Sequence, residues 1–335
     1  MPADPVEKAK HYFNKYTIEC GLLFVVIFYI FLFWKGKNRN NEIAIQWAMT
    51  FQNLIKTQYA HLGMDEKYSV TVEQISYNEY QFYASGRNNL HYTHFMLDLK
   101  KRQDLLSMML LNFLWPERDQ LFIEFALDPR DETLPIELMV IPRKDQKSIY
   151  QTLPYLKSMV SPIQTEGFDK NHKHMVLGED PETIKNLMAN QVGSTLSKFS
   201  DQLHSLHVTD QRCYNKYPLQ MKLSLIVGET QEQHENAAKM FKSVLELADR
   251  LGSLKLSDSV KKMADKNRSS MKKQETKEKQ EGRLEKLYEK KAIEEQERMA
   301  RVRQMSPNSQ RKYEEKQRQK ELKQQKKRLT KMAKF

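Results

Sequence analysis

The sequence feature that most constrains this chain is an apolar run at residues 16–34, YTIECGLLFVVIFYIFLFW. Glu19 is the only charged residue within it. At about 1.5 Å per residue, a helix of this length extends about 28 Å, which is close to the hydrocarbon thickness of a bilayer. A helix also satisfies its backbone hydrogen bonds internally, as lipid requires. The run therefore predicts a single transmembrane helix.

Both ends of the run carry residues that are typical of a membrane interface. Tyr16 and Trp34 are amphipathic aromatic residues, and Lys15 and Lys35 lie just outside them. Glu19 lies near one end, where a carboxylate is either hydrated or functional. We take Tyr16, Glu19 and Trp34 as the anchor residues. The alternatives are a buried helix of a soluble domain and a signal peptide, although no small-residue cleavage site follows the run.

Charge divides the chain into two parts. Residues 261–335 contain 26 Lys and Arg against 12 Asp and Glu, a net charge of +14. The whole chain carries +12, so the first 260 residues carry a net charge of −2. The excess positive charge therefore lies entirely in the C-terminal tail.

The topology follows only weakly from the sequence. The two cysteines, Cys20 and Cys213, form no disulfide framework, which suits a reducing compartment. Lysines and arginines flank the run about equally on both sides, so they do not set its orientation. We expect a short luminal N-terminus at residues 1–15, with the C-terminal part in the cytosol. The sequon at Asn267 would then carry no glycan.

Residues 35–252 have the pattern of an α+β domain, built from units in the order strand, strand, helix. Hairpin-linked strands pair antiparallel, so we expect an antiparallel sheet with helices on one face. The methionines at 108, 109, 139 and 159 fit core packing better than an adaptable client groove. The expected elements are a helix at 41–59, strands at 70–83 and 90–97 around a turn at 85–88, a helix at 100–115, strands at 120–127 and 135–141, a helix at 146–159, a polar connection at 161–173, a helix at 180–199 capped by Asp180, strands at 203–208 and 219–227, and a helix at 232–251.

Residues 253–335 predict a long, solvated, basic helical or coiled-coil tail, which Pro307 should break. Its basic clusters suit phosphate oxygens, and the scarcity of aromatic residues favours structured RNA, bound by shape and charge. The alternatives are a merely solvated helix and a structural membrane tether that binds anionic lipid or a partner helix. The candidate RNA-binding residues are Lys261, Lys262, Lys266, Arg268, Lys272, Lys273, Arg301, Arg303, Arg311, Lys312, Lys326, Lys327 and Arg328.

No other chemistry is indicated. The sequence has no phosphate-binding glycine loop and no nucleophile elbow. Three histidine pairs lack a Cys or acidic partner at a known metal-ligand spacing; they are at residues 91 and 94, 172 and 174, and 204 and 207. We therefore expect no catalytic residues, no metal and no cofactor.

Four segments carry a resemblance to a known family. They are GKNRN at 36–40, LKKRQDLL at 99–106, HSLHVTDQ at 204–211 and ADKNR at 264–268. In this order they resemble the calumin family, coiled-coil-domain proteins of the endoplasmic reticulum. The resemblance extends from the apolar run to the end of the chain.

The resemblance implies a subunit of the PAT complex, which works with the small membrane protein Asterix as an intramembrane chaperone for nascent multi-spanning proteins. In that family the cytosolic domain and basic tail contact the ribosome near its exit tunnel, beside the Sec channel and other multipass translocon subunits. Family members usually carry a signal peptide and a long acidic luminal region. This chain has only about fifteen residues before the run. We therefore expect the anchor to serve as its own targeting signal, without luminal calcium binding.

Overall fold

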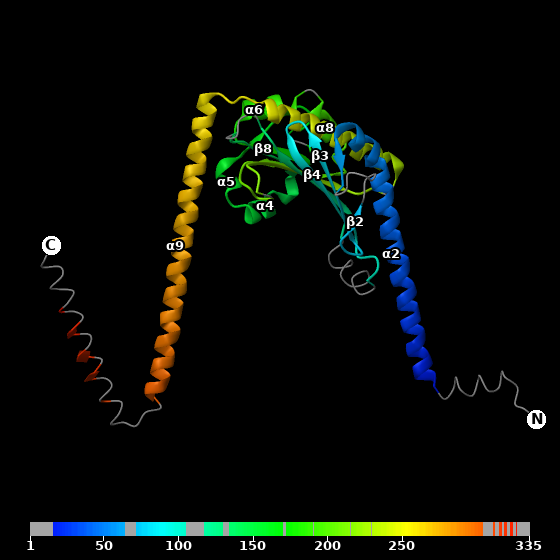
Figure 1. The fold of residues 1–335 in the computed structure, drawn as a ribbon. Coiled ribbons are helices and arrows are strands. Elements are labelled where there is room, and N and C mark those ends of the chain that lie inside the picture. The colour runs from blue at the N-terminus through cyan, green and yellow to red at the C-terminus, as the bar shows by residue number, and fades with distance from the viewer. Residues whose placement is uncertain are drawn as a thin grey trace, which may run out of the picture. The chain divides into compact units, whose positions relative to one another are not determined.

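A single long helix, α2 (Thr17–Gln58), contains both the apolar run and the helix expected at 41–59. The structure, a computed structural model, describes residues 16–63, 72–104, 117–129, 134–169, 172–189, 191–214, 216–228, 230–303, 311, 315–316, 318–319, 322–323 and 326. Two helices were expected, but no proline separates the two segments, and the structure has one continuous helix. Figure 1 shows the N-terminal half of α2 extending away from the sheet.

The apolar half of α2 is long and apolar enough to cross a membrane. No part of its most apolar window is buried within the protein. A core helix of a soluble domain would pack its apolar side chains against other elements, so this alternative from the sequence is wrong.

The strands form one antiparallel sheet, as the sequence predicts. Their order is β1-β3-β4-β5-β10-β9-β6-β8-β7, and β2 pairs with β3. Their bounds are β1 (His61–Leu62), β2 (Glu73–Gln74), β3 (Glu79–Arg87), β4 (Leu90–Asp98), β5 (Gln120–Leu127), β6 (Glu137–Pro142), β7 (Ser161–Ile163), β8 (His174–Gly178), β9 (Leu203–Thr209) and β10 (Leu219–Ile226).

The strand order differs from a row of separate strand-strand-helix units. β5 and β6 follow each other in the chain, but the β9–β10 hairpin lies between them. β10 pairs with β5 along its whole length, and β9 pairs with β6. The expected polar connection at 161–173 also contains a strand, β7, and is followed by another that we did not predict, β8. Both are short, so their periodicity gives little signal.

Two helices predicted as continuous are each broken. The segment at 146–159 forms α4 (Gln146–Thr152), after a 3-10 turn η2 (Arg143–Asp145), and then α5 (Leu156–Met159). Pro154 explains the break, because proline disfavours a helical conformation in the residue before it. The segment at 180–199 forms α6 (Pro181–Met188) and α7 (Val192–Lys198). Gln191 separates them with a left-handed φ of 79°. The predicted cap is confirmed, since Asp180 Oδ2 accepts from the Thr183 N–H at 2.9 Å.

The helix α8 (Gln231–Ser253) packs against α2, α6 and α7 over one face of the sheet (Figure 1). A capping box between Thr230 and Gln233 fixes its start. Its Phe241 is fully buried, with its ring centroid 5.5 Å from that of Phe51 of α2 and 5.4 Å from that of Phe95 of β4. The C-terminal half of α2 is therefore part of the domain core.

The opposite face of the sheet is covered as well around β6 and β8, contrary to the expectation of helices on one face. Along β6, Leu138 and Val140 belong to the main core, whereas Met139 and Ile141 are buried outside it. Successive strand residues point to opposite faces, so a second apolar layer lies there. Figure 1 shows α4 and α5 on that side. Met139 and Met159 are both buried, which confirms core packing for these two methionines.

Three details near the first hairpin also differ. The strand expected at 70–83 is interrupted, since β2 ends at Gln74, β3 begins at Glu79, and residues 75–78 form a loop. Ser85 and Gly86 belong to β3, and the turn lies at residues 88–89, where Asn89 has a φ of 64°. A helix was expected at 100–115, but residues 101–104 are not helical. Residues 105–115, including the methionines at 108 and 109, lie outside the described residues.

The tail begins with α9 (Asp258–Arg303), which follows a connection without helical structure at residues 254–257. The predicted break at Pro307 lies outside the described residues. The chain divides into two compact units, Met1–Asn267 and Arg268–Phe335.

Candidate membrane junction

A buried stripe on α2 joins the apolar run to the domain. Its side chains recur at three- and four-residue spacing, which places them on one helix face. The stripe consists of Gly36, Asn40, Ile43, Ala44, Trp47, Phe51 and Ile55. It begins two residues after Trp34, so the domain encloses α2 almost immediately beyond the apolar run.

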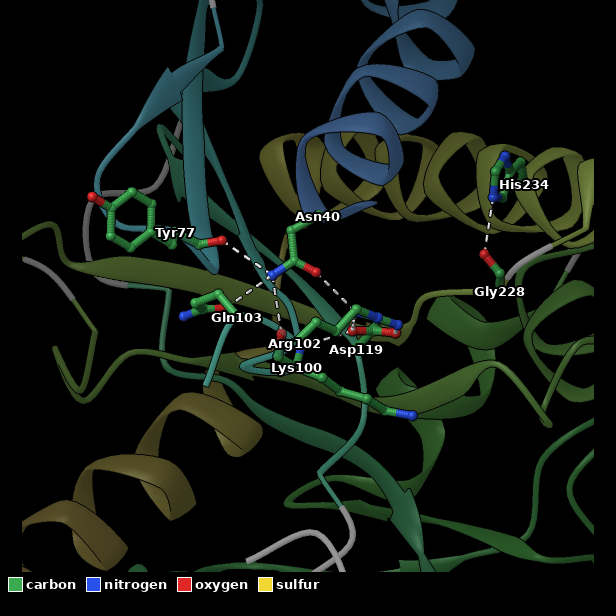
Figure 2. Close-up of polar contacts among 8 residues, drawn as sticks. All are labelled: Asn40, Tyr77, Lys100, Arg102, Gln103, Asp119, Gly228 and His234. Carbon is green, nitrogen blue, oxygen red and sulfur yellow. Dashed lines mark hydrogen bonds and ion pairs between the residues drawn. The ribbon is translucent and has the colours of Figure 1, made fainter. Parts of the chain in front are cut away.

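Asn40 is the polar centre of this stripe and is fully buried (Figure 2). Its Nδ2 donates to the carbonyls of Tyr77 at 3.1 Å and Lys100 at 3.0 Å, with a longer contact of 3.5 Å to Gln103 Oε1. Its Oδ1 accepts from Arg102 at 3.1 Å. The amide therefore ties α2 to two separate loops, and its burial cost is offset by these hydrogen bonds.

Arg102 is held in turn by Asp119, the residue before β5. The guanidinium donates two hydrogen bonds to this carboxylate, at 2.8 and 2.6 Å, and both side chains are largely buried. The backbone N–H of Lys100 donates to the same carboxylate at 2.8 Å. Burial alone would raise the pKa of Asp119, but these hydrogen bonds and charges hold it below its ordinary value. The carboxylate thus stays ionised and keeps Arg102 oriented toward Asn40.

Gly36 permits the close approach of the loop to the helix. A Cβ at this position would lie 2.1 Å from the carbonyl oxygen of Arg102 and 2.6 Å from the N of Gln103. Both neighbours are backbone atoms, which cannot move aside as a flexible side chain can. Glycine is therefore required here by packing against the loop at residues 102–103.

An aromatic contact lies at the membrane end of the junction. The Tyr77 ring meets the Phe33 ring edge-on, with 5.3 Å between centroids. The Lys37 ammonium lies 5.0 Å from the centroid of the same tyrosine ring. The domain therefore touches α2 at the end of the apolar run itself.

The other end of the stripe enters the core. Trp47 stacks on Phe51, with 5.2 Å between ring centroids, and lies 5.0 Å from the His234 ring of α8. His234 Nε2 donates to the Gly228 carbonyl at 2.9 Å (Figure 2). The orientation of α2 on the sheet is thus set at several points along its length.

The three predicted anchor residues lie outside the buried stripe that joins α2 to the domain. Tyr16 and Trp34 are 42% and 62% exposed, and Glu19 is exposed in the first turn of α2. Our sequence analysis missed Gly36, Asn40, Arg102 and Asp119. Gly36 and Asn40 continue the spacing of the apolar positions after them, but their residue types hid the pattern.

The candidate RNA-binding residues divide into several groups. Lys262, Lys266 and Lys273 are exposed, and intervals of four and seven residues place them on one face of α9. Lys272 is also exposed, whereas Lys261 and Arg268 are half-buried. Arg301 and Arg303 lie in the last turn of α9, and Arg311 and Lys326 are exposed; Lys312, Lys327 and Arg328 lie outside the described residues.

The segment HSLHVTDQ contains a buried polar network. His207 joins Glu137 through Nε2 at 2.5 Å and Tyr214 through Nδ1 at 2.5 Å. Burial raises the pKa of Glu137, although its hydrogen bond to His207 acts in the opposite direction. The network links β6, β9 and the segment before β10, so this histidine has a packing role.

The segment ADKNR attaches the first turns of α9 to the domain. Asn267 Nδ2 donates to Glu179 Oε1 at 2.9 Å, and the Asn267 side chain is half-buried within a helix. This nitrogen is the atom that would carry a glycan, so the hydrogen bond competes with glycosylation.

Histidines from two of the sequence pairs lie beside an open cavity of about 640 Å³, where β6 and β10 end and β8 and β9 begin. His172, His174 and His204 line it together with Arg118 and Lys144. Burial lowers the pKa of both His174 and His204, which favours the neutral ring. Within the described part of the chain, no three His, Cys, Asp or Glu side chains gather closely enough to hold a metal ion.

Substituting Gly36 should show that close packing determines this junction. We expect Gly36→Ala to lower stability by at least about 1 kcal/mol, because the added Cβ overlaps backbone atoms. Gly282→Ala is the matched control, since nothing lies within 4 Å of its Cβ and alanine favours a helix. Thermal unfolding of the full chain in detergent, followed by tryptophan fluorescence, compares the two. Equal melting temperatures would contradict the packing argument.

The ion pair between Arg102 and Asp119 should make the protein less stable as pH falls into the acid range. Since the pKa of Asp119 is lower in the folded state, its contribution is present above the unfolded value of about 3.9 and is lost as pH falls through the folded value. We expect Asp119→Asn to destabilise the chain by about 1–3 kcal/mol at pH 7. The difference in melting temperature from wild type should shrink below about pH 4. A difference that stays constant into strong acid would rule out this role of the carboxylate.

Comparison with known proteins places the chain in a family. The model of the family PAT complex subunit CCDC47 matches residues 15–324. An uncharacterized protein of Arabidopsis thaliana is 24% identical over 221 residues, which is 62% of this chain and 45% of the relative. PAT complex subunit CCDC47 of Homo sapiens and that of Danio rerio are each 25% identical over 218 residues, 63% of this chain and 44% of the relative. The chain thus spans less than half the length of these relatives.

Among solved structures, the mycobacterial trehalose monomycolate transport factor A is 9% identical and covers 66% of this chain, with a TM-score of 0.28, too low to indicate a shared fold. The family match begins just before α2 and extends into the tail. It confirms the resemblance to the calumin family that the four segments indicate. The chain belongs to the PAT complex subunit CCDC47 family, which is associated with the endoplasmic reticulum membrane and is not a known enzyme family.

Proposed function

We propose that this chain is a single-pass endoplasmic reticulum membrane protein and a PAT complex subunit that assists insertion and folding of multi-spanning proteins at ribosome-bound translocons. The family match over residues 15–324 carries this proposal. The unburied apolar half of α2 supports a membrane anchor, and the remainder of the chain supplies a folded domain and a basic helix.

The junction suits a subunit that holds partners at a fixed position beside the membrane. One continuous helix enters the core, and the contacts of Gly36 and Asn40 hold it against the loops that precede β3 and β5. A flexible linker would let the domain move independently of the span, whereas this helix transmits the position of the span to the domain. We place an Asterix-like small membrane protein, the Sec channel and other translocon subunits beside this span and domain.

The tail suits docking to ribosomal RNA near the exit tunnel. Lys262, Lys266 and Lys273 present three ammonium groups on one exposed face, and phosphate contacts need no base stacking. The half-buried Lys261 and Arg268 are less available than this face. The exposed lysines are therefore our first choice among the candidate residues.

A structural tether is the second candidate function. Leu284, Leu287 and Ile293 of α9 are all more than half exposed. Exposed apolar side chains on a helix suit a partner helix, which would make α9 a protein-binding segment. Ribosome binding that does not depend on Lys262, Lys266 and Lys273 would favour this alternative.

The orientation should be visible in glycosylation. With α9 in the cytosol, Asn267 carries no sugar, so glycosidase treatment of the full chain from mammalian cells should not change its mobility on a gel. Because Glu179 also holds the Asn267 side chain, the lack of sugar there does not by itself set the orientation. A glycan acceptor tag placed before Met1 tests it directly and should be modified in the lumen. A glycosidase-sensitive Asn267 would overturn the proposed topology.

Charge reversal should release the chain from ribosomes. We expect Lys262→Glu, Lys266→Glu and Lys273→Glu together to lower ribosome cosedimentation at moderate salt. The slope of log affinity against log salt should fall by about two to three, roughly one for each lost phosphate contact. The control is Lys286→Glu, Lys290→Glu and Lys291→Glu, which makes the same charge change at exposed positions of α9. Equal cosedimentation of the two triple variants would reject the assigned face.

A further inference from the structure

We propose that the loop at residues 75–78, between β2 and β3, is a second membrane contact that places Ile75 and Tyr77 in the headgroup region of the bilayer. This inference rests on α2 spanning the membrane, which is part of the proposed function. It adds a lipid-binding surface on the folded domain, separate from the span.

The loop lies at the end of the apolar run. Tyr77 contacts Phe33, which precedes the last residue of the run, with 5.3 Å between ring centroids. The Tyr77 carbonyl accepts a hydrogen bond from Asn40, so the loop is also fixed to α2 about two turns beyond that contact. Any depth that places the apolar run in hydrocarbon therefore brings Tyr77 to the membrane interface.

The exposed side chains of the domain also gather there. Among the described residues between α2 and α9, the large hydrophobic side chains that are well exposed are Ile75, at 53%, and Tyr77, at 45%. The other large apolar residues described in this part of the chain are buried or half-buried. The apolar surface that the folded domain leaves uncovered thus lies beside the end of the span, where lipid would cover it.

The chemistry of this surface suits an interface between lipid and water. Ile75 offers an aliphatic side chain, and Tyr77 offers a ring with a polar tip, a residue type enriched at this depth. The Lys37 ammonium lies over that ring, and Lys35, two residues before Lys37, is exposed. Lys101 is also exposed and lines a cavity together with Asn78 of the loop. The stems of these lysines can lie along apolar surface while the ammonium groups contact lipid phosphates.

The loop is ordered by its own hydrogen bonds. Ser76 Oγ accepts from the backbone N–H of Glu79 at 3.1 Å, and the Ile75 N–H donates to the Glu79 carbonyl at 3.0 Å. Asn78 donates to Asp98 at 3.3 Å. The two exposed side chains are therefore presented by a preformed turn, and membrane contact requires little ordering of the loop.

Fluorescence quenching by nitroxide lipids tests this contact. In a full chain with Cys20→Ser and Cys213→Ser, single cysteines at Ile75→Cys, Ile30→Cys and Lys242→Cys receive the same small fluorophore. Each labelled chain is placed in phosphatidylcholine nanodiscs that carry a nitroxide either on the headgroup or deep in the acyl chain. Lys242 is exposed on α8 and serves as the water-facing control, and Ile30 reports the span.

We expect the headgroup nitroxide to quench position 75 at least twofold more than position 242. Position 30 should instead be quenched most by the acyl-chain nitroxide. A second label, at Gln74→Cys in the exposed strand β2, checks that the result does not depend on replacing Ile75. Unchanged circular dichroism of each labelled chain shows that it is folded.

The labelled positions distinguish a failure of the loop contact from a failure of the membrane anchor. If position 30 is quenched but positions 74 and 75 resemble position 242, the loop does not contact lipid, and its exposed side chains instead face water or a protein partner. If position 30 is not quenched, α2 does not span the bilayer, and the proposed anchoring fails together with this inference.

Discussion

The arrangement of this protein depends on one buried amide. Asn40 lies on a helix face that is otherwise apolar, and its side chain reaches two loops and a guanidinium that belong to distant parts of the chain. A buried amide without these partners would cost several kcal/mol, so the helix and the loops stabilise each other's positions. Because α2 is continuous, this contact also determines how the apolar run leaves the domain.

The segments that carry the family resemblance contain the main buried polar contacts. GKNRN and LKKRQDLL, more than 50 residues apart, meet through Gly36, Asn40 and Arg102. HSLHVTDQ supplies His207 to the network with Glu137. ADKNR supplies Asn267, which holds the start of α9. Each segment thus has a packing role that its residue types alone did not reveal, and the last one also begins the basic tail.

The sequence predicts an element most accurately where the signals for it lie within the element's own residues. β5, β9, β10 and α8 have strong periodicity or caps within their own residues, and they form close to where the sequence predicts them. The helices near Pro154 and Gln191 break because of single-residue backbone conformations that a window average conceals. β7 and β8 are too short for a periodic signal, and pairing in the sheet stabilises them.

By itself, the sequence determined the apolar run, the separation of charge into a basic tail, the α+β class and the family resemblance, since each depends on neighbouring residues or on composition. Only the tertiary structure decided that the β9–β10 hairpin enters between β5 and β6, and that both sheet faces are covered around β6 and β8. It also decided the junction, where Asn40 bonds to residues 37 and 60 positions away and Arg102 to Asp119. Such contacts depend on which distant segments pair in space, and no local pattern encodes that choice.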